Sequence, residues 1–495
     1  MRKIRPIGIT ILLPLVLLVW FCAPGEGATL WAALNADAGQ AFMLVWTADG
    51  DTNGEQLGYA VGTAGDVNGD GFADVIIGVP RDTYTYTDPV GAAYVYHGSA
   101  GGLSGSLSPD WVISGDLTQK GSLLGCAVST AGDVNNDGYD DVIVGAKEYK
   151  IPGFTGAFGA AFVFFGSKTV GLATTPGWSL ISEQKDSALG VAVSTAGDVN
   201  NDTYDDVVIG ASGYPNGGLA YVFLGAADGL TVTRGLTLTI NQPAAQFGYA
   251  VSHAGDINGD GYADIIIGAP GYDIISGTSD VGAVFVYYGA TEGISTTSSA
   301  LYGDQNGSRF GASLSGAGDV NNDGYADIVV GAQYYSRTVT NEGAAFVYLG
   351  SPTGVITVPQ RVLVGGQLAA LFGAAVGTAG DVNKDGYADI VIGASRYTGD
   401  QKDEGAVFVY LGSAAGIDGR PVWRGEGNKS ETLFGFALGT AGDINGDGYV
   451  DLIVGAPDYK TQEQNKRGRA FVYRGTGDTS RYNTIYLPLV LRSSF

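Results

Sequence analysis

The nine-residue stretch DVNGDGFAD at residues 66–74 decides how this sequence is read, because it returns six more times. The later copies are DVNNDGYDD (133–141), DVNNDTYDD (198–206), DINGDGYAD (256–264), DVNNDGYAD (319–327), DVNKDGYAD (381–389) and DINGDGYVD (443–451). The copies start about 63 residues apart on average, a spacing typical of a repeat architecture. A count of domains from chain length alone therefore does not apply here.

Each copy stands in the same frame of short apolar runs. A small-residue run such as GYAVGTAG (58–65) precedes the copy and an apolar run such as VIIG (75–78) follows it. After a variable loop comes a run such as GAVFVYYG (282–289), and one further run such as WVIS (111–114) precedes the next copy. Runs of this length, rich in Val, Ile, Tyr and Phe between Gly, Asn and Asp, predict strands. Seven units of four strands predict an all-β fold, a seven-bladed β-propeller. An open β-solenoid is the alternative, although its period is usually shorter.

The two ends of the repeat region predict how the ring closes. No fourth strand of the usual kind follows the last GRAFVYRG run (468–475), and AFMLVWTA (41–48) precedes the first unit. We expect this N-terminal strand to complete the last blade and so protect the sheet edges. The propeller is therefore predicted to span residues 41–475, with a tail at 476–495.

Composition excludes one broad class of partner. The chain has 495 residues, 50 Asp and Glu against 26 Lys and Arg, and a formal net charge of −24. A nucleic-acid partner is not expected, because phosphate binding needs a basic face. Hydrophobic residues make up 45% of the chain, which is enough for a large core.

The N-terminal residues predict export. A basic start, MRKIR, leads into an apolar run and then small residues, so residues 1–28 are interpreted as a signal peptide. Cleavage is expected near Ala23 or Ala28, and an uncleaved anchor is the alternative. Only Cys126 then remains, so no internal disulfide can form. The apolar tail is too short to span a membrane, and a last strand and a sorting tail are both open for it.

The repeated motif predicts a divalent cation site in every unit. Asp, Asn and Asp alternate at positions 1, 3 and 5, a glycine at position 6 permits a left-handed turn, position 7 offers its carbonyl, and an Asp at position 9 returns from the next strand. The predicted ligands are Asp66, Asn68, Asp70, Phe72 and Asp74; Asp133, Asn135, Asp137, Tyr139 and Asp141; Asp198, Asn200, Asp202, Tyr204 and Asp206; Asp256, Asn258, Asp260, Tyr262 and Asp264; Asp319, Asn321, Asp323, Tyr325 and Asp327; Asp381, Asn383, Asp385, Tyr387 and Asp389; and Asp443, Asn445, Asp447, Tyr449 and Asp451.

The ligand chemistry favours calcium, with up to seven structural Ca²⁺ ions. Hard oxygen ligands in an adaptable loop suit Ca²⁺, whereas Mg²⁺ prefers a stricter octahedron and Zn²⁺ prefers His and Cys. The loop is not an EF-hand, because position 12 carries no Glu and strands flank it. Ordinary polar turns without an ion are the alternative. We expect the third site to bind weakest, since Thr203 replaces the position 6 glycine.

These residues resemble the FG-GAP repeats that form the seven-bladed propeller at the head of integrin α subunits. The Phe-Gly start is present at Phe247-Gly248, Phe310-Gly311, Phe372-Gly373 and Phe434-Gly435, and Gly-Ala-Pro at 268–270 and 455–457. The first three copies carry Leu-Gly instead. The resemblance implies a secreted or cell-surface protein with calcium on one propeller face and recognition of a protein or glycan on the other. We expect no counterpart of the legs, membrane helix and cytoplasmic tail of an integrin, so integrin-type signalling is not expected.

Variable loops follow the second strand of each unit, and such loops on a rigid scaffold are the usual place for recognition. A tyrosine recurs in them, and propeller symmetry would arrange the set as a ring that binds a basic side chain or a sugar face. The alternative is that each tyrosine packs against its neighbouring blade. The predicted ligand-face residues are Tyr84, Tyr149, Tyr214, Tyr272, Tyr335, Tyr397 and Tyr459.

Enzymatic chemistry has little support in the sequence. His97 and His253 look like single-copy substitutions in structural positions, and no nucleophile elbow, zinc helix or phosphate loop is present. Cys126 is expected to be a small buried hydrophobe. The prediction is an adhesion or binding module and not an enzyme. A secreted polysaccharide-acting enzyme, with carboxylates paired across the channel, and a purely structural surface protein are the alternatives.

Overall fold

The computed structural model describes residues 41–81, 90–104, 108–114, 121–230, 235–274, 279–462 and 465–478. All of them belong to the second of two compact units, Gln40–Phe495. These residues form strands and turns, and no helix occurs among them. The predicted signal peptide, the tail from residue 479 onward and Tyr84 lie outside the described residues.

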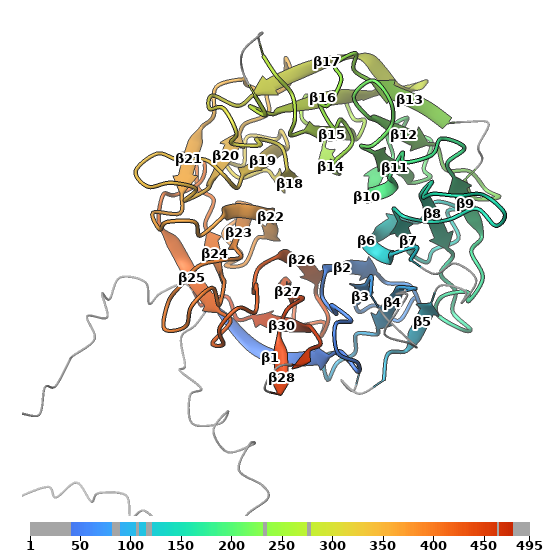
Figure 1. Ribbon diagram of the computed structural model, residues 1–495, viewed down its shortest axis with the longest axis horizontal. Coiled ribbons are helices and arrows are strands. Elements are labelled where there is room, and N and C mark those ends of the chain that lie inside the picture. Colours follow the sequence, from blue (N-terminus) through green and yellow to red (C-terminus); the bar gives the residue numbers. More distant parts are fainter. Residues whose placement is uncertain are drawn as a thin grey trace, which may run out of the picture. The chain divides into compact units, whose positions relative to one another are not determined.

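Seven four-stranded antiparallel sheets stand side by side around a central channel (Figure 1). The strands of blades 1 to 4 are β2 (Ala60–Gly65), β3 (Asp74–Val79), β4 (Ala92–Tyr96) and β5 (Trp111–Ser114); β6 (Leu124–Gly132), β7 (Asp141–Ala146), β8 (Ala160–Phe164) and β9 (Trp178–Ile181); β10 (Leu189–Gly197), β11 (Asp206–Ala211), β12 (Leu219–Phe223) and β13 (Gly235–Thr239); and β14 (Ala250–Gly255), β15 (Asp264–Ala269), β16 (Ala283–Ala290) and β17 (Gly293–Tyr302).

The remaining three blades continue the same order. Their strands are β18 (Ser313–Gly318), β19 (Asp327–Ala332), β20 (Ala344–Tyr348) and β21 (Arg361–Val364); β22 (Phe372–Gly380), β23 (Asp389–Ala394), β24 (Ala406–Tyr410) and β25 (Pro421–Glu426); and β26 (Ala437–Gly442), β27 (Asp451–Ala456), β30 (Arg469–Gly475) and β1 (Phe42–Asp49). A small hairpin that the sequence did not predict, β28 (Lys460–Gln462) with β29 (Asn465–Lys466), lies in the last blade between β27 and β30. The predicted seven-bladed propeller is confirmed.

The N-terminal strand closes the ring as predicted. β1 pairs antiparallel with β30, from Phe42 opposite Gly475 to Asp49 opposite Arg469. Phe42 is fully buried, and its ring lies 5.3 Å from that of Trp423 in blade 6. The guanidinium of Arg469 donates to both carboxylate oxygens of Asp49. The two ends of the propeller therefore share one sheet.

The hydrophobic core lies between adjacent blades. The second strand of every blade is buried along its whole length, as an apolar strand covered on both faces requires. One cluster contains Val284 of blade 4, Phe310 of the segment that follows blade 4, and Val330 and Phe346 of blade 5. Every other boundary between blades in the described residues has an equivalent cluster. Each blade is thus stabilised by its two neighbours.

One close approach explains why glycines recur at the blade boundaries. Gly268 in β15 faces the backbone carbonyl of Gly311 in the next blade, and a side chain on Gly268 would overlap that oxygen. Gly311 itself has a φ of 84°, a conformation that favours glycine. The Phe-Gly and Gly-Ala-Pro elements are therefore two halves of one interblade contact.

Candidate functional site

The seven repeated motifs all connect the first and second strands of their blades. In blade 5, for example, residues 319–327 run from β18 to the start of β19. We call these seven segments the Asp loops, and the end of the propeller that carries them the loop face. Because the strands are antiparallel, the connections between second and third strands lie at the other end, which we call the opposite face.

Backbone hydrogen bonds to the short acidic side chains shape each Asp loop. In blade 5 the Asp319 carboxylate accepts from the amides of Asp323 (3.1 Å) and Gly324 (2.8 Å). The side-chain oxygen of Asn321 accepts from Asp323 as well (3.2 Å), and Asp323 accepts from Tyr325 (3.1 Å). The amide at position 6 donates to the position 1 carboxylate in all seven blades. The alternation of Asp and Asn is what folds the loop back on itself.

The aspartate at position 9 has a structural role that the sequence did not reveal. Asp327 is fully buried, and its two oxygens accept from the amides of Val320 and Gly350, both at 2.8 Å. Gly350 follows the third strand, so one carboxylate joins the Asp loop to two more parts of its blade. All seven blades repeat this pair of bonds. The recurring glycine at or just beyond the end of each third strand was the available signal.

Burial makes these seven position 9 carboxyls hard to ionise. Desolvation, with a smaller contribution from the nearby carboxylates of Asp319 and Asp323, raises the pKa of Asp327 to about 7, although the two backbone amides act to lower it. The same causes raise the pKa of five equivalents to about 7 and that of Asp141 to about 8. A cation beside such a carboxyl would favour its ionised form.

The predicted ligand atoms of the loops are all oxygens, which is the ligand type that a hard cation prefers. In the part of the chain that the structure describes, no three acidic, His or Cys side chains converge on one point as a ready metal site. The carboxylates of positions 1 and 5 are held instead by backbone amides, and in blade 5 each accepting oxygen keeps a further lone pair. The five predicted ligands thus share one loop, and their convergence on an ion remains a prediction.

The third loop carries the predicted strain. Thr203 has a φ of 79°, in the region where its counterparts are glycines such as Gly324 at 92°. A β-branched residue is an outlier in this conformation. The Thr203 hydroxyl accepts from the side-chain amide of Asn136 in the preceding blade (3.0 Å), which partly compensates.

Hydrogen bonds also join successive Asp loops to one another. The carbonyl of Asp256 accepts from Ala326 of the next blade (2.9 Å), and that of Ile257 accepts from Ser351 (3.1 Å). The equivalent bonds between the last blade and the first run from Ala73 to Asp443 (3.1 Å) and from Ser99 to Ile444 (3.0 Å). The Asp loops are therefore part of the ring closure.

Two blade boundaries carry an extra acid at position 8. Asp140 accepts from the amide of Asp66 (2.7 Å), and Asp205 accepts from the amide of Asp133 (2.9 Å). Burial raises the pKa of both carboxyls, and backbone hydrogen bonds lower it. The other blades have Ala or Val there, so the first two Asp loops lie in the most acidic surroundings.

The predicted ligand-face tyrosines lie on the opposite face and pack within the blades. Five of the six described rings stand edge-on to a phenylalanine of the third strand of their own blade, with centroids 5.6–5.8 Å apart. All six also join the hydrophobic clusters between blades. Tyr459 is buried and the other five are half-buried. These contacts favour the packing alternative, and a ligand-binding role for the ring stays a prediction.

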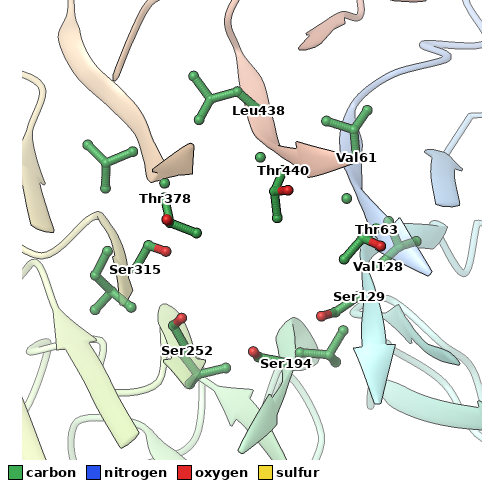
Figure 2. A pocket seen from close by; sticks show the side chains of 17 residues that line it. Val61, Thr63, Val128, Ser129, Ser194, Ser252, Ser315, Thr378, Leu438 and Thr440 are labelled. Atoms are coloured by element: carbon green, nitrogen blue, oxygen red, sulfur yellow. The ribbon is translucent and has the colours of Figure 1, made fainter. Parts of the chain in front are cut away.

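The central channel holds a cavity of about 310 Å³ lined by all seven blades. Figure 2 shows serine and threonine side chains around it, among them Ser129, Ser194, Ser252 and Ser315 from four consecutive blades. The remaining lining residues are Val, Leu, Thr and Gly. The channel wall is thus aliphatic and hydroxyl-bearing.

His253 and Cys126 occupy structural positions. The Nδ1 atom of His253 lies 3.0 Å from the carbonyl of Ala196, and burial lowers the pKa of its imidazole. The Cys126 thiol is buried, lies 3.5 Å from the carbonyl of Gly190, and has its pKa raised by desolvation. Among the described residues, no helix is long and apolar enough to cross a membrane.

The comparisons with known proteins agree with the repeat geometry. The FG-GAP repeat family matches seven segments, namely residues 57–96, 127–164, 189–223, 247–287, 310–348, 372–410 and 434–473. Integrin alpha-5 of Xenopus laevis is 33% identical over 222 residues, which is 43% of this chain and 20% of that protein. Human integrin alpha-IIb is 34% identical over 219 residues (42% and 20%), and Drosophila melanogaster integrin alpha-PS2 is 34% identical over 241 residues (46% and 16%). The matched region spans about a fifth of these relatives.

Proposed function

This chain belongs to the FG-GAP repeat family, and from that premise we propose that it is a calcium-stabilised, integrin-alpha-like binding or adhesion module that acts outside the cell. Its partner would be an extracellular protein or a glycan. The proposal does not include catalysis or nucleic-acid binding.

The observation that carries the proposal is that the two faces of the propeller differ in how far their loops repeat. The loop face repeats one hydrogen-bonded, oxygen-rich loop in every blade, whereas the loops on the opposite face differ in sequence from blade to blade. A repeated rigid end and a variable end are the arrangement expected of a recognition scaffold. The relatives named above are integrin alpha subunits, which supports adhesion as the general role.

Calcium is proposed for the Asp loops on their donor chemistry. Seven loops with three predicted ligand aspartates each bring 21 ligand carboxylates to one face, and seven Ca²⁺ ions would neutralise 14 of those charges. Without a cation, like charges in each loop oppose folding. A cation that binds only the folded loops would stabilise the propeller, which has no internal disulfide among the described residues.

The proposal is tested by pull-down from a cell-surface extract with the full chain immobilised in calcium or in chelator. A variant with the six described tyrosines changed to alanine is compared, after calorimetry has established that both proteins are folded with calcium. A partner retained by the parent in calcium and lost in chelator supports the proposed function, and loss in the variant assigns it to the opposite face. Retention of no specific partner in calcium contradicts it.

A further inference from the structure

Blade 3 differs from its neighbours on the opposite face because its loop is short. Only seven residues, 212–218, join β11 to β12. The corresponding loops of the other blades contain 11 to 13 residues. Less backbone is therefore available to cover the outer end of the cleft between blades 2 and 3.

The tyrosine of this short loop lacks the partners that its equivalents have. The Tyr335 hydroxyl donates to Asp304 (3.5 Å), and those of Tyr397 and Tyr459 accept from Arg424 and Arg469, both at 3.2 Å. In the described part of the chain, the hydroxyl of Tyr214 has no hydrogen-bond partner. Its polar end is left available to a ligand.

The third strand of blade 3 presents a second phenol to the same space. Tyr221 occupies the position that is Phe in blades 2 and 4 to 7, such as Phe285, and it pairs across the sheet with Thr237. Burial raises the pKa of Tyr221, and the nearby Tyr214 and Glu183 raise it further. Tyr214, Tyr221 and Glu183 all line the same cavity.

These side chains line a cavity of about 340 Å³ between blades 2 and 3. Leu180 of β9 forms part of one wall, Tyr214 and Tyr221 form part of the other, and Glu183, Gln184 and Thr237 add polar groups. The Gln184 amide donates to the carbonyl of Lys185 (2.9 Å), which leaves its own oxygen as an acceptor. Aromatic walls with a few polar groups are typical of small-ligand sites of this size.

We propose that this cavity binds one hexopyranose unit of a neutral glycan, with a sugar face on the tyrosine rings and its hydroxyls on Glu183, Gln184 and the phenols. The apolar body and polar tip of tyrosine suit a ligand that has both a C–H face and a rim of hydroxyls. A basic side chain suits the cavity less well. It would meet only one carboxylate, that of the exposed Glu183, and the other polar groups of the cavity would make no hydrogen bond to it. The inference rests on the proposed function and names its ligand class.

The test is saturation-transfer NMR on the calcium-loaded full chain, with the methyl glycosides of glucose, galactose and mannose as probes. We expect at least one glycoside to bind and Tyr214→Ala to weaken that binding at least tenfold. Glu183→Gln should weaken it less, because an amide still accepts one hydrogen bond. Tyr302→Ala, which removes an exposed tyrosine of blade 4 outside the cavity, should leave it unchanged. Tyr214→Phe guards against misfolding, since it keeps the ring and removes only the hydroxyl.

Three results would overturn the inference: no binding by any of the three glycosides, equal binding by the parent and Tyr214→Ala, or displacement of the glycoside by the amide of N-acetyl-lysine at lower concentration. The failure of the proposed function is recognised separately, because it requires that the extract pull-down retain no specific partner in calcium. If the pull-down retains a partner in calcium and one of the three results above is found, the adhesion module stands and only the glycan cavity is wrong.

Discussion

The loop face and the opposite face of this propeller are built by different means. On the loop face, the same carboxylate accepts the same two amides in all seven blades, and the loops are bonded to one another around the ring. On the opposite face five of the six described tyrosines share a ring contact, yet the hydroxyls of three of them meet Asp304, Arg424 or Arg469, and that of Tyr214 meets no partner among the described residues.

This difference teaches that repetition and variation have separate tasks here. The repeated bonds of the loop face hold each blade together and close the ring, so any departure there should affect stability. The single-copy departures of the opposite face, above all the short loop of blade 3, change shape and chemistry without disturbing the core. The expectations that follow test this separation.

Removal of calcium should have the largest effect, because it acts on all seven Asp loops at once. A cation at 100 times its dissociation constant stabilises the folded state by about 2.7 kcal/mol per site. We therefore expect EDTA to lower the melting temperature strongly and added Ca²⁺ to restore it, as followed by circular dichroism. An unchanged melting temperature would show that the loop face is stable without a cation.

Asp327→Ala should be the most harmful single change on the loop face, and Asp323→Ala its matched control. The first variant leaves the buried amides of Val320 and Gly350 without acceptors, at about 1–3 kcal/mol each. Asp323 is exposed and should change the free energy of unfolding by less than about 1 kcal/mol. Denaturant unfolding in EDTA measures both without interference from a cation. Equal losses in the two variants would contradict the proposed role of position 9.

Tyr459→Ala and Tyr214→Ala compare a buried and a half-buried tyrosine of the opposite face. Tyr459 is 7% exposed and packs against Phe471, so its loss should lower the free energy of unfolding by about 3 kcal/mol. Tyr214 is half-buried, so Tyr214→Ala should lower the free energy of unfolding by about 1 kcal/mol. Chemical denaturation of both variants is the measurement, and a larger loss at Tyr214 would show that it is mainly a packing residue.

Thr203→Gly should have the smallest effect and the opposite sign. Relief of the left-handed conformation is worth about 1–2 kcal/mol, and loss of the bond from Asn136 offsets part of it. We expect a small gain in stability and tighter binding at the third site in a calcium titration. Gly324→Thr in blade 5 is the converse control and should weaken its own site. Equal affinities in Thr203→Gly and the parent would refute the strain argument.

The sequence predicted most of the fold and where the Asp loops lie. Seven copies of one motif, each within the same four apolar runs, led to the blade number, the strand count and the closing role of residues 41–48, all of which β1 and the seven sheets bear out. The position 6 conformation was also foreseen, since Gly324 and Thr203 both have a positive φ. These features depend on neighbours along the chain or on the repeat itself, so local pattern is sufficient to find them.

Other features were decided only when distant residues met in space. The second acceptor role of Asp327 depends on Gly350, 23 residues away, and the loop-to-loop bond from Ala326 reaches 70 residues back to Asp256. The tyrosines recur at one spacing in the sequence, but their partners come from other strands, and so the sequence does not distinguish Tyr335 from Tyr214. The sequence by itself determined the propeller and its repeated loops, because each unit carries the same local pattern. The tertiary structure alone decided which carboxylates are buried, how the blades are joined and where a cavity opens, because those properties depend on contacts between residues far apart in the chain.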